Sequence, residues 1–462
     1  MMRTKITRMM AIIAIVAAAP LAGAPAAKVT PIDSIVSEIS ATRIEATIRR
    51  LVSFGTRNSL SDTRSDRRGV GAARRWIKDE LEGCAEASGG RLEVALDEHL
   101  VESAARVPRP TQIVNVIATL PGEEAQGRER LYVVSGHYDS IASSPVDAQR
   151  DAPGADDDAS GVAVAMELAC VMARYRFRAT LVFMAVAGEE QGLLGSTAWV
   201  QAAKAKGLNV AAMISNDIVG NTRSAEGKVE RGRVRLYAEG VPPLKSLPDE
   251  VVAALRTSGE NDLATRQLAR FMVEAAERHV PHLKVDLIYL RDRYLRGSDH
   301  FPFLDAGYAA VRFVEALEDW RHQHQDVRLE DGVQYGDLPE FVDFAYVADV
   351  ARVNAAALAA LALGPSTPRE VQMENLRLES NTTLRWQANP EPDVAGYRIV
   401  WRETTAPLWQ HAKDVGNVTR ATLIDISKDT FIFGVQAYDA EGHLSVAAYP
   451  RPYRPVAPAP AR

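Results

Sequence analysis

The sequence predicts an α/β fold with a mixed, mostly parallel central sheet sandwiched by helices, followed by a small C-terminal all-β sandwich. Continuous apolar runs such as residues 181–186 suit strands that are buried on both faces. Over residues 28–363 these runs alternate with segments of helical periodicity, the pattern of an α/β sandwich. Beyond residue 369 the pattern changes to short strands separated by turn residues, which favours a separate all-β region.

Several segments of the first region have the hydrophobic spacing of helices. In the clearest of them, Val162, Met166, Ala169 and Ala173 recur at helical intervals. The predicted helices cover residues 41–52, 70–81, 161–175, 263–278 and 346–363.

Apolar segments between these helices predict the strands of the sheet. They cover residues 113–120, 131–135, 180–187, 212–216, 234–238, 285–290 and 309–314. Because open α/β sheets bind ligands at the carboxyl ends of their strands, polar residues that directly follow these segments are the candidates for function.

The C-terminal region begins with a predicted linker at residues 364–369, which contains two prolines. Residues 370–455 are expected to form a β-sandwich with strands at 376–378, 383–386, 396–401 and 431–437. This region resembles a fibronectin type III domain, with Trp386 and Tyr397 at the expected core positions. Phe431 stands where that family usually has a tyrosine, so the corner hydrogen bond is expected to be missing. Residues 456–462 are expected to be a disordered tail.

The first 27 residues have the layout of a secretory signal peptide. Arg3, Lys5 and Arg8 form a basic start, an apolar run follows at residues 9–19, and small residues lead to residue 27. An uncleaved anchor is the alternative, although the run is short for a membrane span. We expect an exported protein, periplasmic or secreted, with no stable membrane insertion after signal cleavage.

Composition narrows the classes of partner. The chain has 462 residues, 47% hydrophobic content and a formal net charge of −6, so nothing indicates a nucleic-acid partner. Two cysteines in a chain of this size do not make a disulfide scaffold. Cys170 lies on the apolar stripe of a predicted helix and is expected to be a small residue of the core. Whether it pairs with Cys84 is left open. The oligomeric state is left open as well.

Histidines and carboxylates follow several predicted strands. His137 comes just after the strand at 131–135, and Asp139, two residues on, can accept an imidazole N–H and select the nitrogen that faces a metal. Asp217 follows the strand at 212–216. Of the later histidines, His322 and His324 are expected to line the cleft, with Asp326 nearby.

Two clusters of carboxylates strengthen this prediction. Asp156, Asp157 and Asp158 precede a helix, and although one aspartate suffices as a cap, three in a row repel one another unless a cation is present. Glu189 and Glu190 follow a buried strand, where adjacent side chains point in different directions. One can therefore bind a metal while its neighbour faces a water molecule.

Taken in order, these motifs resemble the M28 family of zinc peptidases over roughly residues 105–363. The motifs are His137-Tyr138-Asp139, residues 154–161, residues 188–192, Asn216-Asp217 and Ser298-Asp299-His300. The resemblance implies two Zn²⁺ ions per chain. One would be held by His137 and Asp217, the other by Glu190 and His300, with Asp157 bridging both.

The resemblance also implies the catalytic roles. Glu189 would be the general base and acid, and Asp139 would orient His137. The family often has a cis peptide after the bridging aspartate, which would fall at Asp157-Asp158. The function implied is that of a metallo-aminopeptidase that releases the first residue of peptide or protein substrates.

Three alternatives stay open from the sequence. The first is a carboxypeptidase of the same family, in which Arg293 and Arg296 could bind a substrate carboxylate, although exposure of both side chains is the expectation. The second is a single-zinc transferase like the glutaminyl cyclases, which share the fold, although residues 156–161 look more like the peptidases. The third is a non-catalytic binding protein. Side-chain specificity and the native metal are left open as well.

Overall fold

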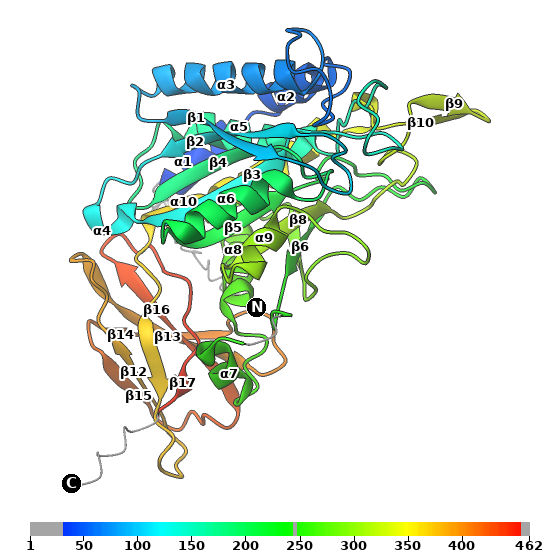
Figure 1. Cartoon of the computed structure of the whole chain (residues 1–462). Coiled ribbons are helices and arrows are strands. Elements are labelled where there is room, and N and C mark those ends of the chain that lie inside the picture. Colours follow the sequence, from blue (N-terminus) through cyan, green and yellow to red (C-terminus); the bar gives the residue numbers. More distant parts are fainter. Residues whose placement is uncertain (1–30, 244–246, 454–462) are drawn as a thin grey trace, which may run out of the picture.

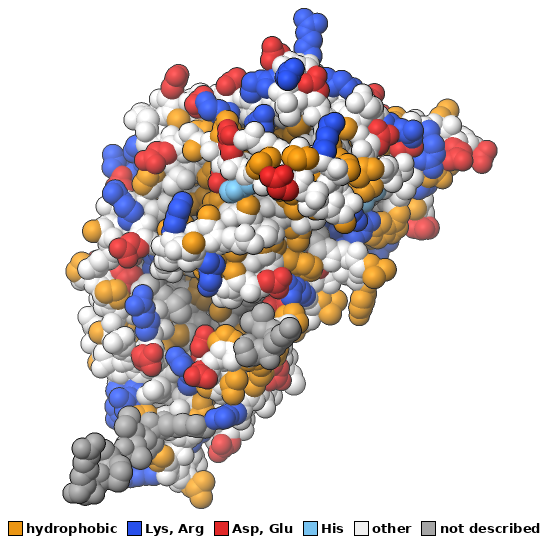
Figure 2. Space-filling model, in the orientation of Figure 1, with side chains coloured by type: hydrophobic (Ala, Val, Ile, Leu, Met, Phe, Trp, Pro, Cys, Tyr) orange, Lys and Arg blue, Asp and Glu red, His pale blue; other side chains and the backbone are white. Residues whose placement is uncertain are grey.

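The computed structural model describes residues 31–243 and 247–453 (Figure 1). The predicted signal peptide and the predicted C-terminal tail lie outside these described residues. Figure 2 shows acidic and basic side chains interspersed over the visible face.

The core of the molecule is an eight-stranded mixed sheet with the order β1-β2-β4-β3-β5-β8-β6-β7. Its four central strands, β4-β3-β5-β8, are parallel to one another. The pairings β1–β2, β2–β4 and β6–β8 are antiparallel. The predicted fold class is thereby confirmed. The strands are β1 (Glu93–Val101), β2 (Thr111–Leu120), β3 (Arg130–His137), β4 (Thr180–Val186), β5 (Asn209–Asn216), β6 (Arg233–Ala238), β7 (Lys284–Ile288) and β8 (Ala310–Glu315).

Helices cover both faces of this sheet (Figure 1). Two successive residues of β3 show this. The Val134 side chain packs into the larger core, and the Val133 side chain packs into a smaller core on the opposite face. The larger core is built with α1 (Pro31–Glu38), α2 (Ala41–Val52), α3 (Val70–Ala87), α5 (Ala159–Met172), α8 (Ala264–His279) and α10 (Phe344–Leu363). The opposite face carries α6 (Leu194–Ala205) and α9 (His300–Asp305). Shorter elements are α4 (Ala125–Arg128), α7 (Asp249–Leu255), the 3₁₀ turn η1 (Pro339–Phe341) and the hairpin β9 (Arg328–Glu330) and β10 (Val333–Tyr335).

Helix α10 lies in the middle of the larger core. By length and composition it is the one helix among the described residues that could cross a membrane, yet 78% of its most apolar window is buried in the protein. A helix that is apolar all round is expected in such a position. Its buried Asn354 exchanges hydrogen bonds with Asn216 at the end of β5, at 2.9 and 3.1 Å.

A disulfide bond joins Cys84 of α3 to Cys170 of α5. This answers the question that the sequence left open about the two cysteines. The bond ties the outer helix α3 to α5, whose N-terminus carries the aspartate cluster.

The C-terminal region forms two small sheets, β15-β12-β11-β17 and β14-β13-β16. Trp386 and Tyr397 are buried with ring centroids 5.3 Å apart, and the Tyr397 hydroxyl accepts the Asn389 N–H at 2.7 Å. The prediction of a strand at 376–378 is wrong, because pairing with β12 and β17 is made earlier in the chain, by β11, and Leu378 is fully exposed. The strands are β11 (Arg369–Met373), β12 (Thr382–Gln387), β13 (Val394–Glu403), β14 (His411–Gly416), β15 (Arg420–Leu423), β16 (Phe431–Asp439) and β17 (Arg451–Pro452).

Buried and partly buried ion pairs join the C-terminal sheets to the α/β region, along a boundary that we call the seam. The pairs are Arg402–Asp262 at 2.7 Å, Arg130–Glu391 at 3.4 Å, and Arg178 with Asp393 and Asp439. The C-terminal sheets are therefore packed against the α/β region and are not held by the linker alone.

Candidate metal centre

The parallel register of the central strands brings the candidate residues together. His137 is the last residue of β3 and lies opposite Val186, the last residue of β4. On the other side of β3 the neighbouring strand β5 ends at Asn216. Residues that directly follow β4 and β5 therefore emerge beside His137, as expected at the carboxyl edge of a parallel sheet.

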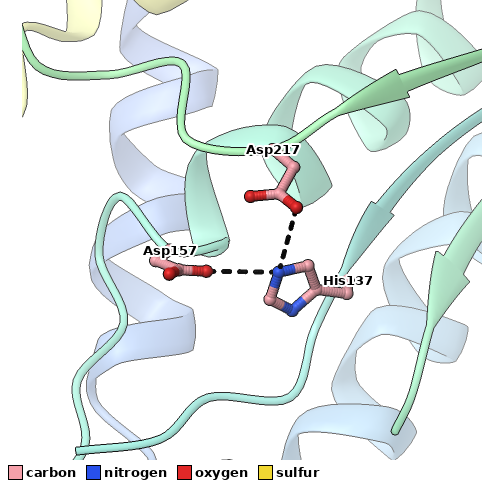
Figure 3. Close-up of side chains that lie close together, drawn as sticks. All are labelled: His137, Asp157 and Asp217. Atoms are coloured by element: carbon pink, nitrogen blue, oxygen red, sulfur yellow. Dashed lines mark ion pairs between the residues drawn. The ribbon is translucent and has the colours of Figure 1, made fainter. Parts of the chain in front are cut away.

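His137 and two aspartates form the first group of possible metal ligands (Figure 3). The His137 Nε2 atom lies 3.2 Å from Asp157 Oδ1 and 3.7 Å from Asp217 Oδ2. Figure 3 shows both carboxylates, which come from different loops, pointing at the same ring nitrogen. All three side chains are buried. The structure thus brings together the residues that were expected to hold the first ion.

A second group forms around His324. Its Nε2 atom lies 3.1 Å from Asp157 Oδ2 and 3.1 Å from Glu190 Oε1. Asp157 therefore offers one carboxylate oxygen to each histidine, an arrangement suited to bridging two cations. Burial lowers the pKa of His324, but the carboxylates of Glu190 and Asp157 outweigh it and raise that pKa to about 11, which shows how strongly anionic this position is.

The expectation that His300 would stand beside Glu190 is not met. His300 is buried at the start of α9, and its Nε2–H donates to the carbonyl of Arg291 at 3.0 Å. Burial lowers its pKa to about 4, so the ring is neutral. The expected place of His300 is taken by His324, which lies in the segment between β8 and β9.

The Ser298-Asp299-His300 motif reaches the centre through its serine. The Ser298 hydroxyl donates to Asp217 Oδ2 at 2.5 Å. The other oxygen of Asp217 lies 2.9 Å from the guanidinium of Arg312, a fully buried residue of β8. Burial raises the pKa of the Asp217 carboxyl, but Arg312 and then His137 outweigh it and hold that pKa well below its usual range. Asp217 therefore stays ionised.

Arg57 holds the backbone behind the centre. This fully buried guanidinium donates to the carbonyls of Tyr138 (2.6 Å), Pro153 (2.5 Å) and Gly154 (2.8 Å). It thereby connects the end of β3 to the loop that leads into the three aspartates. Its charge also offsets part of the negative charge of Asp337 and of those neighbouring carboxylates.

Asp158 and Asp139 orient the centre through backbone contacts. Asp158 accepts the His137 N–H at 2.8 Å and caps α5 through the Gly161 N–H at 2.9 Å. The Asp139 carboxylate accepts the N–H groups of Glu189 and Glu190, both at 3.3 Å. The His137 Nδ1 atom contacts the Asp139 backbone carbonyl at 3.1 Å and lies 3.6 Å from its carboxylate. The His137 ring is therefore held by the Asp139 backbone carbonyl, and the Asp139 carboxylate, which was expected to accept from the ring, lies farther away.

Glu189 lies beside both groups and forms a third possible ligand group with His137 and Glu190, one that does not include Asp157. One of its oxygens lies within 4.8 Å of ligand atoms of His137 and Glu190, and the side chain is only partly buried. Burial and the neighbouring carboxylates raise its pKa well above the ordinary glutamate value, although His137 opposes the shift. The peptide bond between Asp157 and Asp158 is cis, as the family resemblance implies.

The donor set fits zinc. Each group has one imidazole nitrogen and two carboxylates, counting Asp157 in both, which matches the mixed nitrogen and oxygen ligation of catalytic zinc and leaves a coordination position for water or substrate. Hard cations such as Mg²⁺ and Ca²⁺ favour all-oxygen sites instead.

Two contributors were missed by sequence reasoning. Arg57 gave no signal, because a lone arginine after a helix is usually exposed. Arg312 gave a weak one, since a charged residue inside the apolar segment 309–314 needs a buried partner.

A sheet of this kind with two ligand groups that share one aspartate is typical of metal-dependent hydrolases. A family model described as peptidase family M28 matches residues 115–329. A probable zinc metalloprotease from Leptosphaeria maculans is 46% identical over 423 residues, which covers 91% of this chain and 97% of that protein. Another from Pyrenophora teres f. teres is 45% identical over 420 residues, covering 91% of this chain and 86% of that protein. The chain therefore belongs to peptidase family M28, and both of these relatives are named as probable zinc metalloproteases.

A solved structure shows the same fold. The aminopeptidase LapA of Legionella pneumophila superposes with a TM-score of 0.50 at 18% identity, covering 71% of this chain and 74% of that chain.

Proposed function

We propose that this protein is an exported aminopeptidase that uses two zinc ions. The observation that carries the proposal is the position of Asp157, which presents one oxygen to His137 and the other to His324. Asp217 would complete the first ion's ligands and Glu190 those of the second. His324 replaces His300 in this assignment.

Glu189 is the residue placed to move protons. Zinc, when bound, supplies a Lewis acid that polarises the scissile carbonyl and makes water more acidic. The Glu189 carboxylate accepts the proton of the attacking water and delivers it to the leaving amine. Its backbone N–H is held by Asp139, which also holds Glu190, so base and ligand keep a fixed spacing.

Export and the class of the C-terminal region belong to the same proposal. Export is supported by the basic start, the apolar run and the small residues of the first 27 positions. A fibronectin type III-like class is supported by the two small sheets and by the buried contact of Trp386 with Tyr397.

The test is hydrolysis of matched peptides with free and blocked N-termini, with and without a chelator, followed by identification of the products. Chelator-sensitive release of one residue from the free-amine peptide alone is the expected result. Release of the last residue from both peptides would contradict the aminopeptidase assignment while leaving a peptidase. No cleavage by metal-loaded protein would contradict both.

Metal analysis separates the two histidines. His324→Ala should lose about half of the bound zinc and most of the activity, because His324 supplies the single nitrogen ligand of the second group. His300→Gln is the matched control and should retain both ions.

A further inference from the structure

Arg296 lies at the edge of the metal centre, in the loop between β7 and α9. Its guanidinium Nη1 is 3.4 Å from His324 Nδ1, and the group stacks on Trp320 at 5.1 Å from the ring centroid. Trp320 is 53% exposed and the His324 side chain 30% exposed, so this edge is open to solvent. The stacking holds the guanidinium in place before any ligand arrives.

Arg296 differs from the arginines around it in having no carboxylate partner. Between residues 291 and 328, all of which are described, it is the one arginine without an ion pair. Arg293, its neighbour in the loop, is buried against Glu318 and is not available to a substrate. The partners of the other arginines are Glu239 and Asp305 for Arg291, Asp217 and Asp292 for Arg312, Asp319 for Arg321 and Glu330 for Arg328.

The contact with His324 does not satisfy this guanidinium. Arginine can only donate, and a His324 ring that carries a proton on Nδ1 cannot accept from it, so this 3.4 Å contact leaves the guanidinium without an acceptor. When Nε2 binds a metal, the neutral ring carries its proton on Nδ1, which then has no acceptor to offer. In the metal-loaded protein the N–H groups of Arg296 therefore need another acceptor.

We propose that Arg296 binds the free α-carboxylate of the substrate residue that follows the scissile bond. A guanidinium pairs with a carboxylate through two parallel hydrogen bonds. The guanidinium contacts Nδ1 of the same His324 ring whose Nε2 atom meets Asp157 and Glu190, and one extended residue spans about 3.3–3.6 Å. A carboxylate one residue beyond the scissile carbonyl therefore falls within reach.

This inference rests on the proposed function and names its substrate class. In an aminopeptidase, the residue after the scissile bond carries a free carboxylate only when the substrate is a dipeptide. Arg296 therefore makes dipeptides the preferred substrates over longer chains and over dipeptides with an amidated end.

One other arginine near the centre is a competitor for this role. Arg106 is exposed and donates to the backbone carbonyl of Glu190 at 2.8 Å. Among the described contacts, no aromatic ring holds its guanidinium in place. It is therefore included in the test.

The experiment compares the zinc-loaded enzyme on a dipeptide, its C-terminal amide, and the N-acetylated dipeptide. We expect kcat/KM for the free acid to exceed that for the amide by roughly 10- to 100-fold, mainly through KM, as for a lost charged hydrogen bond. In Arg296→Met this ratio should fall close to one, and in Arg296→Lys it should recover partly, because lysine keeps the charge but loses the two-pronged geometry. Arg385→Met is the matched control, since Arg385 also stacks on an aromatic ring, Tyr453 at 4.7 Å, but in the C-terminal sheets.

The outcomes separate this inference from the proposed function. Cleavage of acid and amide at equal rates by the parent enzyme would overturn the role of Arg296 and leave the aminopeptidase. A preference that survives Arg296→Met but disappears in Arg106→Met would also overturn it. Cleavage of the acetylated dipeptide would contradict the aminopeptidase, and an acid preference that is lost in Arg296→Met would still support the carboxylate contact. No cleavage of any peptide would contradict both.

Discussion

The metal centre and the seam both bury charged groups, but they balance the charge differently. At the seam, Arg402 and Asp262 face each other with side chains 3% and 1% exposed. At the centre, the carboxylates of Asp157, Glu190 and Asp217 gather around two imidazoles. The seam neutralises its carboxylates with arginines of the same chain, and the centre does so only in part.

The difference indicates what each region is for. A buried ionised group is costly unless it is paired or binds a metal. The seam meets that condition within the chain, so it can stabilise the folded protein without a ligand. The centre meets it only in part, through Arg57 and Arg312, and the remaining negative charge is what favours divalent cations.

The largest expected effect tests whether one carboxylate of the centre, that of Glu189, transfers protons and does not bind the metal. Glu189→Ala should lower kcat at least roughly 100-fold, because it removes the proton acceptor. Its zinc content should stay at the parental value, since Glu189 is outside the ligand groups shared by Asp157. Steady-state kinetics with metal analysis of the same sample measures both.

Asp157→Ala is the contrasting variant, because Asp157 serves both groups. It should lose zinc as well as activity. A Glu189→Ala protein that stays fully active would remove the general base from the mechanism, and one that loses its zinc would make Glu189 a ligand.

The fold was the part most accessible to sequence reasoning. The segments predicted as helices at 41–52 and 263–278 form α2 and α8 within one residue at each end, because their apolar spacing directly reflects a buried face. Helix α6 was missed: its buried residues are mainly small, Gly195, Ser196 and Ala203, and they leave a weak apolar stripe.

The candidate site was predictable where ligands follow strands. His137 and Asp217 could be placed because β3 and β5 end beside them. The structure places His324, and not His300, beside Glu190, because the position of each depends on the path of the long connection before it and therefore on tertiary contacts. His324, moreover, adopts a φ of +50°, a left-handed conformation that no sequence pattern here indicates.

The next largest effect tests whether the ion pairs of the seam stabilise the folded protein without a bound ligand. Arg402→Met leaves Asp262 buried without its main partner, although Arg270 remains 3.4 Å away. We expect the free energy of unfolding to fall by about 3–5 kcal/mol. Chemical denaturation of the zinc-loaded protein measures this, and the zinc content should not change.

The control for that variant removes both charges. Arg402→Met combined with Asp262→Asn should recover part of the lost stability, because the unpaired carboxylate charge is gone and the amide oxygen can still accept from Arg270. If the double variant is no more stable than Arg402→Met alone, the seam depends on packing and not on charge pairing.

A smaller effect concerns the disulfide that ties α5 to α3. Replacing Cys84 and Cys170 by alanine should cost about 2–4 kcal/mol of unfolding free energy, because the cross-link restricts the unfolded chain. Zinc affinity should be unchanged, since the N-terminus of α5 is held by Asp158 and Arg57. Zinc titration of this variant checks that point, and a weakened affinity would show that the centre relies on the remote cross-link.

The smallest effect is expected where an ion pair is exposed. Arg398 and Asp414 pair at 2.6 Å on neighbouring strands β13 and β14, with side chains 31% and 55% exposed. Arg398→Ala should lower the unfolding free energy by about 0.2–1 kcal/mol, because water solvates and screens both charges in either state. The same denaturation measurement applies, repeated at high salt, where the difference from the parent should shrink further. A loss as large as that of Arg402→Met would mean that burial does not decide the strength of these pairs, and the contrast between seam and surface would have to be abandoned.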